Sequence, residues 1–260
     1  MISLNNLEKP PKTKPVIATI VGEGGIGKTT LAAAFQSPTI FIRTEDGTQS
    51  LAGREDVSMF PVARKSSDVL DAIRALAKEE HDFKTVALDS ITQLNTMIEH
   101  EIIEADWKAK SISQADGGYG AGYSAAAEKH RKIREAMDYL SAKKKMHVVF
   151  IAHSDIETID LPDQDQFQRY TIRMHRKSVA HYSDNVDLVA YIKLKMHIVG
   201  SSESKKAIST GERIITCYPA ANHVSKNRYG ITEDIPFELG KNPFDGLIPA
   251  LSTVNEEKEK

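Results

Sequence analysis

Ten consecutive residues near the start of the chain constrain its fold more than any other stretch. They read Val21-Gly22-Glu23-Gly24-Gly25-Ile26-Gly27-Lys28-Thr29-Thr30. An apolar, β-branched run at residues 16–21 precedes them and predicts a buried strand, and residues 31–35 predict a helix. The pattern G-x-x-x-x-G-K-[ST] therefore stands between a strand and a helix, which is the setting in which it marks a phosphate-binding loop.

The spacing of glycine, lysine and threonine in this loop has a direct chemical meaning. Glycine allows positive φ, so that successive backbone N–H groups can converge on an anion. The following helix directs its free N–H groups and the positive end of its dipole to the same place. Lys28 is expected to reach the β- and γ-phosphates, and the Thr29 hydroxyl to bind Mg²⁺. The sequence thus predicts a nucleotide-phosphate site formed by Gly22, Glu23, Gly24, Gly25, Ile26, Gly27, Lys28, Thr29 and Thr30.

Composition narrows the class of protein without adding a function. A chain of 260 residues with 40% hydrophobic and 27% charged residues is typical of a soluble globular protein with a full core. A net charge of −2 means that binding to nucleic acid would depend on local basic patches. Cys217 is the single cysteine, which excludes an intrachain disulfide and a cysteine-rich zinc site. With no secretory signal and no run of membrane-spanning length, we expect a cytoplasmic protein without membrane contact.

Short apolar strands alternate with helices through the first 150 residues or so of the chain. Strands are expected at 39–44, 57–62, 84–90 and 147–152, and helices after a Ser66-Ser67-Asp68 cap, at 91–105 and at 126–145. This alternation predicts an α/β fold with a mainly parallel sheet and crossover helices. We expect a flexible lead-in over residues 1–14, one domain over 15–250 and a charged, solvated tail over 251–260.

The pattern changes after residue 152. An acidic loop is expected at 155–165, a strand with one exposed face at 169–174 and a short helix at 177–182. Residues 187–194 and 213–218 are strand-like, and 201–206 resemble a hairpin tip. Because no second core is evident, these strands are expected to extend the same sheet in antiparallel orientation.

Two carboxylates follow predicted strands, at the edge of a parallel sheet where ligands bind. Asp89 closes an apolar strand and is expected to hold Mg²⁺ directly or through water, or else to cap the helix that follows. Glu45 is expected to polarise a water molecule in line with the γ-phosphate, unless it is an exposed loop residue.

Three segments carry a resemblance to a known family. Residues 41–47 resemble the RecA-family segment that ends in the catalytic glutamate, and residues 85–90 resemble its Walker B strand. Residues 225–230 are similar to the basic pair that RecA recombinases and replicative hexameric helicases insert into a neighbouring subunit's nucleotide. Over residues 15–240 the chain most resembles phage-encoded RecA-fold ATPases linked to single-strand annealing and recombination, in which Ile-Ala-His and Lys-Asn-Arg (here 151–153 and 226–228) are usual.

This resemblance implies a RecA-like P-loop NTPase that binds ATP with Mg²⁺ and hydrolyses it to ADP and phosphate. Glu45 would be catalytic, and His153 would sense the γ-phosphate, with Asp155 as the competing alignment. Lys226 and Arg228 would act in trans, in a ring or a filament of identical subunits. The implied partners are single-stranded DNA and a single-strand-binding protein, and the implied compartment is the cytoplasm of a bacterial host.

The resemblance also places two DNA loops. The first, residues 108–123, contains Lys108, Lys110, Tyr119 and Tyr123, which suit phosphate pairing and base stacking. The second, residues 155–168, departs from the family because it carries Asp155, Glu157, Asp160, Asp163 and Asp165. Arg169, Arg173, Arg176 and Lys177 follow it and are the alternative source of positive charge.

Other classes fit the residues less well. Partition ATPases carry a signature lysine where this chain has Glu23. A small-molecule kinase would need a lid with phosphate-binding arginines. A nucleotide-switched oligomeric module and a helicase-like loader without recombinase activity remain alternatives. The nine histidines show no metal-ligand spacing.

Overall fold

The computed structural model describes residues 13–199 and 206–252, together with Ser3, Leu7, Lys9 and Pro11. Most of the expected lead-in, the hairpin tip at 201–205 and the tail beyond residue 252 lie outside the described residues. None of the helices in the described ranges is long and apolar enough to cross a lipid bilayer.

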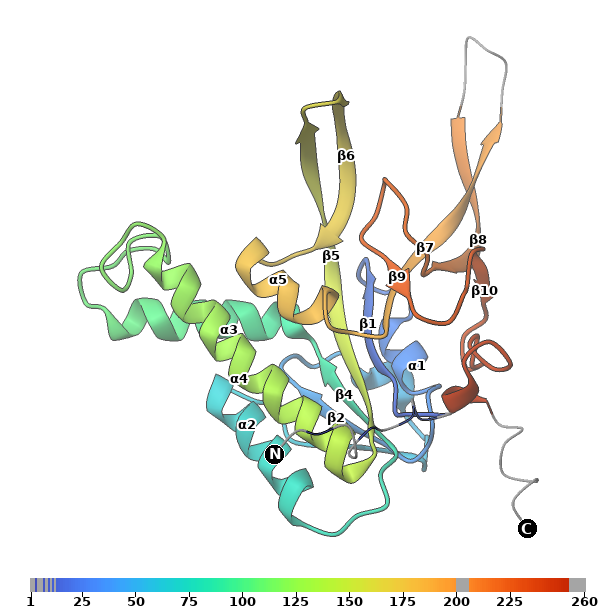
Figure 1. The fold of residues 1–260 in the computed structure, drawn as a ribbon, viewed down its shortest axis with the longest axis horizontal. Coiled ribbons are helices and arrows are strands. Elements are labelled where there is room, and N and C mark those ends of the chain that lie inside the picture. The colour runs from blue at the N-terminus through green and yellow to red at the C-terminus, as the bar shows by residue number, and fades with distance from the viewer. Residues whose placement is uncertain are drawn as a thin grey trace.

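A mainly parallel sheet forms the centre of the molecule (Figure 1). Its strand order is β10-β8-β7-β1-β5-β4-β2-β3. Six neighbouring strands run parallel: β1 (Ile17–Gly22), β2 (Thr39–Arg43), β3 (Val57–Met59), β4 (Thr85–Asp89), β5 (His147–Leu161) and β7 (Leu188–Val199). Among the described residues, four strands run antiparallel to their neighbours: β6 (Gln164–Ile172), β8 (Lys206–Thr216), β9 (Lys226–Asn227) and β10 (Ile235–Phe237). The α/β fold with antiparallel strands added towards the C-terminus is therefore confirmed.

One detail of the strand prediction is wrong. We expected residues 187–194 to extend the sheet antiparallel, whereas β7 runs parallel to β1. The physical reason is the helix α5 (Arg176–Ser183), which carries the chain back to the amino end of the sheet before β7 begins. The backbone N–H of Asp187 then donates to the Ile17 carbonyl at 2.8 Å, at the start of β1.

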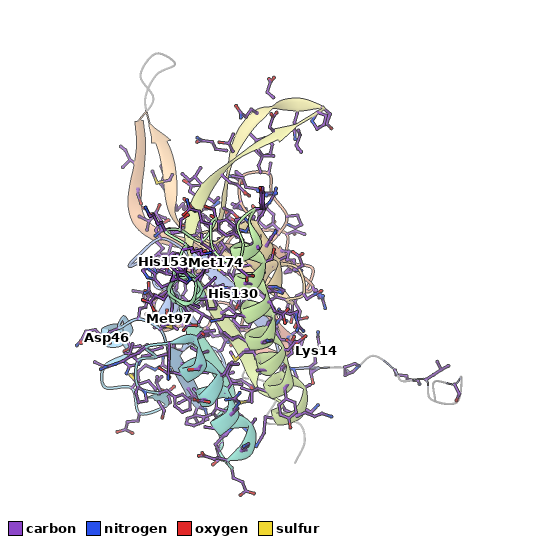
Figure 2. The ribbon with its side chains drawn as sticks, turned by 90° about the vertical axis from the view of Figure 1, so that its left-hand side faces the viewer. Lys14, Asp46, Met97, His130, His153 and Met174 are labelled. Carbon is purple, nitrogen blue, oxygen red and sulfur yellow. The ribbon has the colours of Figure 1, made fainter. Side chains whose placement is uncertain are left out.

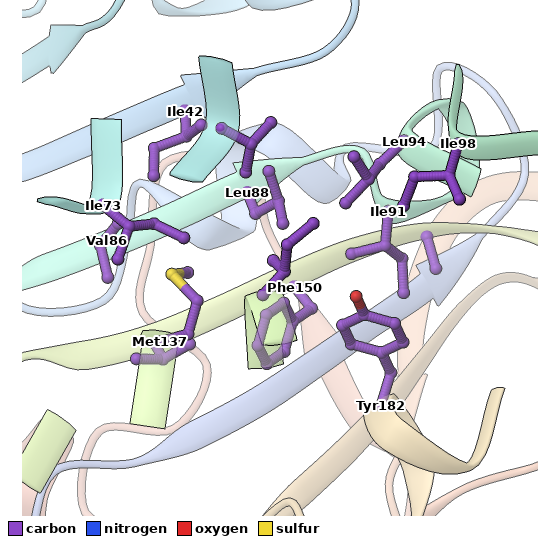
Figure 3. Close-up of a cluster of buried hydrophobic side chains, with 14 of the residues drawn as sticks. Ile42, Ile73, Val86, Leu88, Ile91, Leu94, Ile98, Met137, Phe150 and Tyr182 are labelled. Carbon is purple, nitrogen blue, oxygen red and sulfur yellow. The ribbon is translucent and has the colours of Figure 1, made fainter. Parts of the chain in front are cut away.

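Both faces of the sheet are covered, because alternate strand residues point to opposite sides. One face packs against α2 (Ser66–Lys78), α3 (Ile91–Ala105), α4 (Ala121–Lys144) and α5. Ile42, Leu88 and Phe150 point into this core, where they meet Met137 and Tyr182 (Figure 3). The other face packs against α1 (Lys28–Ala32) and the C-terminal segment that ends in η3 (Pro249–Leu251). The strands that carry the candidate site are thus fixed from both sides.

Helix boundaries follow the sequence closely, with three differences. The predicted helix at 91–105 matches α3. Helix α4 begins at Ala121 rather than at residue 126, and α1 ends at Ala32 rather than at residue 35. A short 3-10 helix, η2 (Thr48–Leu51), lies between β2 and β3. The residue that caps α2 is Lys65 rather than a serine, because the Asp68 carboxylate accepts the Lys65 backbone N–H at 3.2 Å.

Two long hairpins leave the carboxyl edge of the sheet in the same general direction (Figure 1). Strand β5 continues past the sheet and pairs with β6 (Gln164–Ile172), and β7 pairs with β8. We call residues 154–172 the acidic arm. The prediction of an acidic loop at 155–165 is wrong, because these residues form the two strands and the turn of this arm. Residues 160–166, the outer part of this arm, are exposed to solvent and need no apolar alternation, so strands there are hard to recognise in sequence.

Candidate active site

The phosphate-binding loop joins β1 to α1 at the carboxyl edge of the sheet. Gly25 and Gly27 have φ values of 72° and 106°, in the left-handed region that favours glycine. Gly22 meets a different limit, because a Cβ atom there would stand 2.9 Å from the Ile192 carbonyl oxygen. The loop therefore owes its shape to glycine at three positions, two through backbone conformation and one through close approach.

Lys28 lies buried beneath this loop. Its Nζ donates to the carbonyl oxygens of Gly22 at 3.0 Å and Glu23 at 2.7 Å. Burial lowers the pKa of Lys28 to about 8, while the nearby carboxylates of Asp89 and Glu45 act in the opposite direction. An ammonium group held in this environment is stabilised by added negative charge, such as that of a phosphate.

Thr29, in the first turn of α1, contacts Asp89, the last residue of β4, as expected of a magnesium site. The Thr29 hydroxyl donates to Asp89 Oδ2 at 2.8 Å. Asp89 is 3% exposed, and its pKa is raised by burial and lowered by the hydrogen bond from Thr29. A hydroxyl and a carboxylate at this separation present the hard oxygen ligands that Mg²⁺ prefers. The residues present therefore fit a magnesium ion held by Thr29, with Asp89 as a direct or water-linked ligand.

Glu45 and His153 form a second pair beside the first. His153 Nε2 lies 3.3 Å from Glu45 Oε1, and this hydrogen bond is the largest cause that lowers the pKa of Glu45. Figure 2 shows His153 near the edge from which the hairpins leave. Because the pKa of Glu45 is depressed, the carboxylate is ionised at neutral pH and can accept a hydrogen bond from water. Asp155, the alternative sensor, lies in the acidic arm, where its Oδ1 accepts the Ile156 backbone N–H at 2.9 Å.

Hydroxyl groups that the sequence analysis missed hold these acidic and basic groups in place. Thr44 donates through its hydroxyl to the Ser90 carbonyl at 2.8 Å and accepts the Ser90 N–H at 2.9 Å, which ties the end of β2 to the end of β4. Thr92 accepts the His153 backbone N–H at 2.9 Å. Threonine is common in strands and helices, so neither residue has a sequence signal apart from its position next to a strand end.

The antiparallel part of the sheet also reaches the loop, which no sequence pattern predicted. Arg213 of β8 donates through Nε to the Ile26 carbonyl at 3.0 Å. A Cβ on Gly27 would meet Leu239 at 2.7 Å and Phe237 at 3.2 Å. The loop is therefore stabilised by residues nearly two hundred positions further along the chain. No local sequence pattern predicts such contacts.

Lys226 and Arg228 lie at the other end of the sheet. Strand β9 pairs with Leu188 and Val189 at the start of β7, and the Arg228 N–H donates to the Asp187 carbonyl at 3.0 Å. The Arg228 guanidinium contacts the Asp187 carboxylate at 3.3 Å, and the Lys226 ammonium donates to the Asp184 carbonyl. From this end of β1 to the phosphate loop is about 16 Å at 3.3 Å per residue. The structure therefore separates these two cations from Lys28 of the same chain.

The expected first DNA loop forms the tip of the α3–α4 hairpin. Its shape is fixed by Asp106, whose carboxylate accepts the backbone N–H groups of Lys108 and Asp116, each at 3.1 Å. Tyr119 is fully exposed there, whereas the Tyr123 ring stacks on His175 at 4.0 Å. Trp107, which the sequence analysis did not single out, is 87% exposed beside Lys108. The tip stands at the far end of α3, about 22 Å of helix from the active-site edge.

Sheet order, phosphate loop and strand-end carboxylates together define a P-loop NTPase fold. A family model described as an AAA domain matches residues 14–229, from just before β1 to just after β9. Because this match covers most of the chain, the protein belongs to this family of P-loop ATPases. A search of curated proteins found no match. The finer resemblance to phage recombination ATPases stays a prediction.

Proposed function

We propose that this protein hydrolyses ATP to ADP and phosphate in a magnesium-dependent reaction. The observation that supports this most is the meeting of groups from four strands at one edge of the sheet. Lys28 and Thr29 follow β1, Glu45 follows β2, Asp89 ends β4 and His153 belongs to β5. A phosphate loop alone would account for nucleotide binding, whereas an ionised carboxylate beside it adds the group that hydrolysis requires.

Each group has a distinct role in this proposal. The loop N–H groups and Lys28 hold the β- and γ-phosphates, and Thr29 with Asp89 holds the magnesium ion, which neutralises charge on those phosphates when it is bound. Glu45 orients the attacking water and accepts its hydrogen bond. His153 keeps Glu45 ionised through their 3.3 Å contact and lies where a change at the γ-phosphate alters that contact.

A second copy of the chain completes the site in this proposal. Transition-state charge on a transferred phosphoryl group is commonly stabilised by an arginine from outside the phosphate loop. Arg228 is half exposed, with 54% of its side chain in solvent, and its own chain's phosphate site lies at the opposite end of the sheet. Lys226 and Arg228 therefore suit the nucleotide of a neighbouring subunit in a homo-oligomer.

We further propose that the protein acts on single-stranded DNA, as expected for recombination or annealing. The α3–α4 tip supports this, because Trp107 and Tyr119 offer aromatic surfaces for base stacking and Lys108 and Lys110 offer charge for phosphates. The acidic arm, with five carboxylates against one arginine, opposes a role as the second DNA loop. A single-strand-binding protein is the further partner in this proposal.

Phosphate release with and without single-stranded DNA tests the function. Glu45→Gln is expected to lower kcat by about a hundredfold or more because it removes the group that orients water. Asp46→Asn is the matched control, since Asp46 is the next residue and its side chain is 80% exposed. Equal rates for both variants and the wild type would reject the role of Glu45.

The change in the rate of phosphate release on adding single-stranded DNA separates the proposal from its alternatives. Stimulation by single-stranded DNA, with binding that weakens as salt rises, is expected for a recombination or annealing role. Nucleotide binding without phosphate release would instead favour a nucleotide-switched module. Hydrolysis with no salt-dependent DNA binding would remove the DNA role and leave a loader or another ATPase.

A further inference from the structure

Arg173 lies at the junction between the acidic arm and the candidate active site. It is the first residue after β6, and its backbone N–H donates to the His153 carbonyl at 2.9 Å. Its Nη2 donates to the Ser154 carbonyl at 3.1 Å. His153 is in turn the register partner of Gly22, the first glycine of the phosphate loop. Figure 2 shows His153 and Met174, the residue after Arg173, beside each other at this edge.

The charge of Arg173 is not balanced by a carboxylate. Within the described ranges no ion pair joins Arg173 to an acidic side chain, whereas Arg169, on the same arm, contacts Glu157 at 2.6 Å. The Arg173 charge also lowers the pKa of Lys28, in the same direction as burial, which is the larger cause. Arg173 and Lys28 therefore repel each other, and an anion bound between them would relieve this repulsion.

We propose that Arg173 is a ligand of the terminal phosphate of a nucleoside triphosphate bound to its own chain. The planar guanidinium fork suits two oxygens of one phosphate, and the guanidinium is tethered where strand β5 leaves the sheet. This inference rests on the proposed function, because it requires a triphosphate on the loop. Arg173 would thus be a cation that acts on the nucleotide of its own chain. Lys226 and Arg228, in contrast, suit only the nucleotide of a neighbouring subunit.

The position of Arg173 also links the nucleotide site to the acidic arm. Ile172, the residue before it, is buried and pairs with Ser154 at the base of the acidic arm. A guanidinium that binds the terminal phosphate therefore connects nucleotide state to the base of that arm.

Affinity for two nucleotides separates this role from a general effect on the site. We would titrate fluorescent ADP and a fluorescent, non-hydrolysable ATP analogue, both with Mg²⁺, into wild type, Arg173→Ala, Arg173→Lys and Arg74→Ala. The last variant is the matched control, because Arg74 is exposed on α2 and, among the described residues, its one ion pair is with Asp71. Loss of a charge-assisted bond is expected to weaken the triphosphate analogue about tenfold or more in Arg173→Ala and leave ADP within about twofold. Arg173→Lys is expected to retain part of the preference, and Arg74→Ala all of it.

The outcomes separate this role from the proposed function. An unchanged ratio of the two affinities in Arg173→Ala, or equal weakening of both nucleotides, would overturn the role of Arg173 alone. A wild-type chain that binds neither nucleotide would overturn the proposed function and this inference together. If Arg173→Ala does not fold, Arg173→Gln decides the question by the same ratio.

Discussion

At the scale of single residues, charge state matters as much as position. Glu45 and Asp89 are both carboxylates beside Lys28, yet their pKa values move in opposite directions. The hydrogen bond from His153 lowers the pKa of Glu45, whereas burial raises the pKa of Asp89. The ionised Glu45 is thus suited to water, and Asp89 is suited to a cation that compensates for its burial.

Glycine at position 27 makes the sharpest residue-scale prediction. Gly27→Ala should lower the free energy of unfolding by about 1–2 kcal/mol, because L-residues are strained at positive φ and the new methyl group would meet Leu239 at 2.7 Å. Gly24→Ala is the matched control, since a Cβ there meets nothing within 4 Å and φ is not in the left-handed region. Urea unfolding without nucleotide measures both. Equal stability of the two variants would contradict this account of the loop.

At the scale of elements, the start of β1, the strand that leads into the phosphate loop, is joined to the start of β5 by a buried histidine. His147, at the start of β5, accepts the Val16 backbone N–H on Nδ1 at 3.0 Å. Its proton therefore lies on Nε2, which faces Gln36 Oε1 at 3.1 Å. Burial lowers the pKa of His147 to about 4, because the charged imidazolium would lose its hydration. Protonation would also place a second N–H against that of Val16.

Acid should loosen this junction. The folded-state pKa of His147 lies below the unfolded value of 6.5, so the unfolded chain binds more protons between pH 6.5 and about pH 4. Stability should therefore fall as the pH falls through this window, by about 2–3 kcal/mol for this residue. His147→Asn keeps an acceptor and does not titrate, so its free energy of unfolding should depend less on pH. Parallel wild-type and variant curves from pH 7.5 to 4.5 would show that His147 does not contribute.

At the scale of the whole molecule, the sheet separates two sets of cations. Lys28, Arg173 and Arg213 lie at the carboxyl edge with the phosphate loop, and Lys226 and Arg228 lie at the amino edge. The sheet is rigid and packed on both faces, so the carboxyl and amino ends of its strands cannot come together. If Arg228 acts in hydrolysis, a second subunit must receive it.

Mixing two inactive variants tests this arrangement. Arg228→Ala should bind ATP normally and lose most hydrolysis, by about a thousandfold if it acts as an arginine finger. Glu45→Gln should be inactive for a different reason. A mixture should regain part of the activity, because some interfaces then pair an intact Glu45 with an intact Arg228. Undiminished turnover in Arg228→Ala alone would reject the trans role, and a thermal melt controls for its contact with Asp187.

Local sequence patterns predicted the central part of the fold. Apolar runs and strand-end carboxylates predicted β1, β2, β4 and the start of β5, and the glycine spacing predicted the loop between β1 and α1. They did so because a strand buried on both faces is apolar throughout and a phosphate loop needs glycine at fixed spacing. The strand predicted at 169–174 covers only the base of β6, and the outer part of the acidic arm escaped prediction because residues 160–166 are exposed.

What the sequence determined by itself is the phosphate loop and the apolar strands on either side of the core, since glycine spacing and an apolar run are patterns within a short stretch of chain. Only the tertiary structure decided that β7 is parallel to β1, that Arg213 reaches the loop, that Arg173 lies beside His153, and that Arg228 stands away from the loop. These positions depend on which distant segments pack together, and a guanidinium or a short strand carries no local mark of its partner.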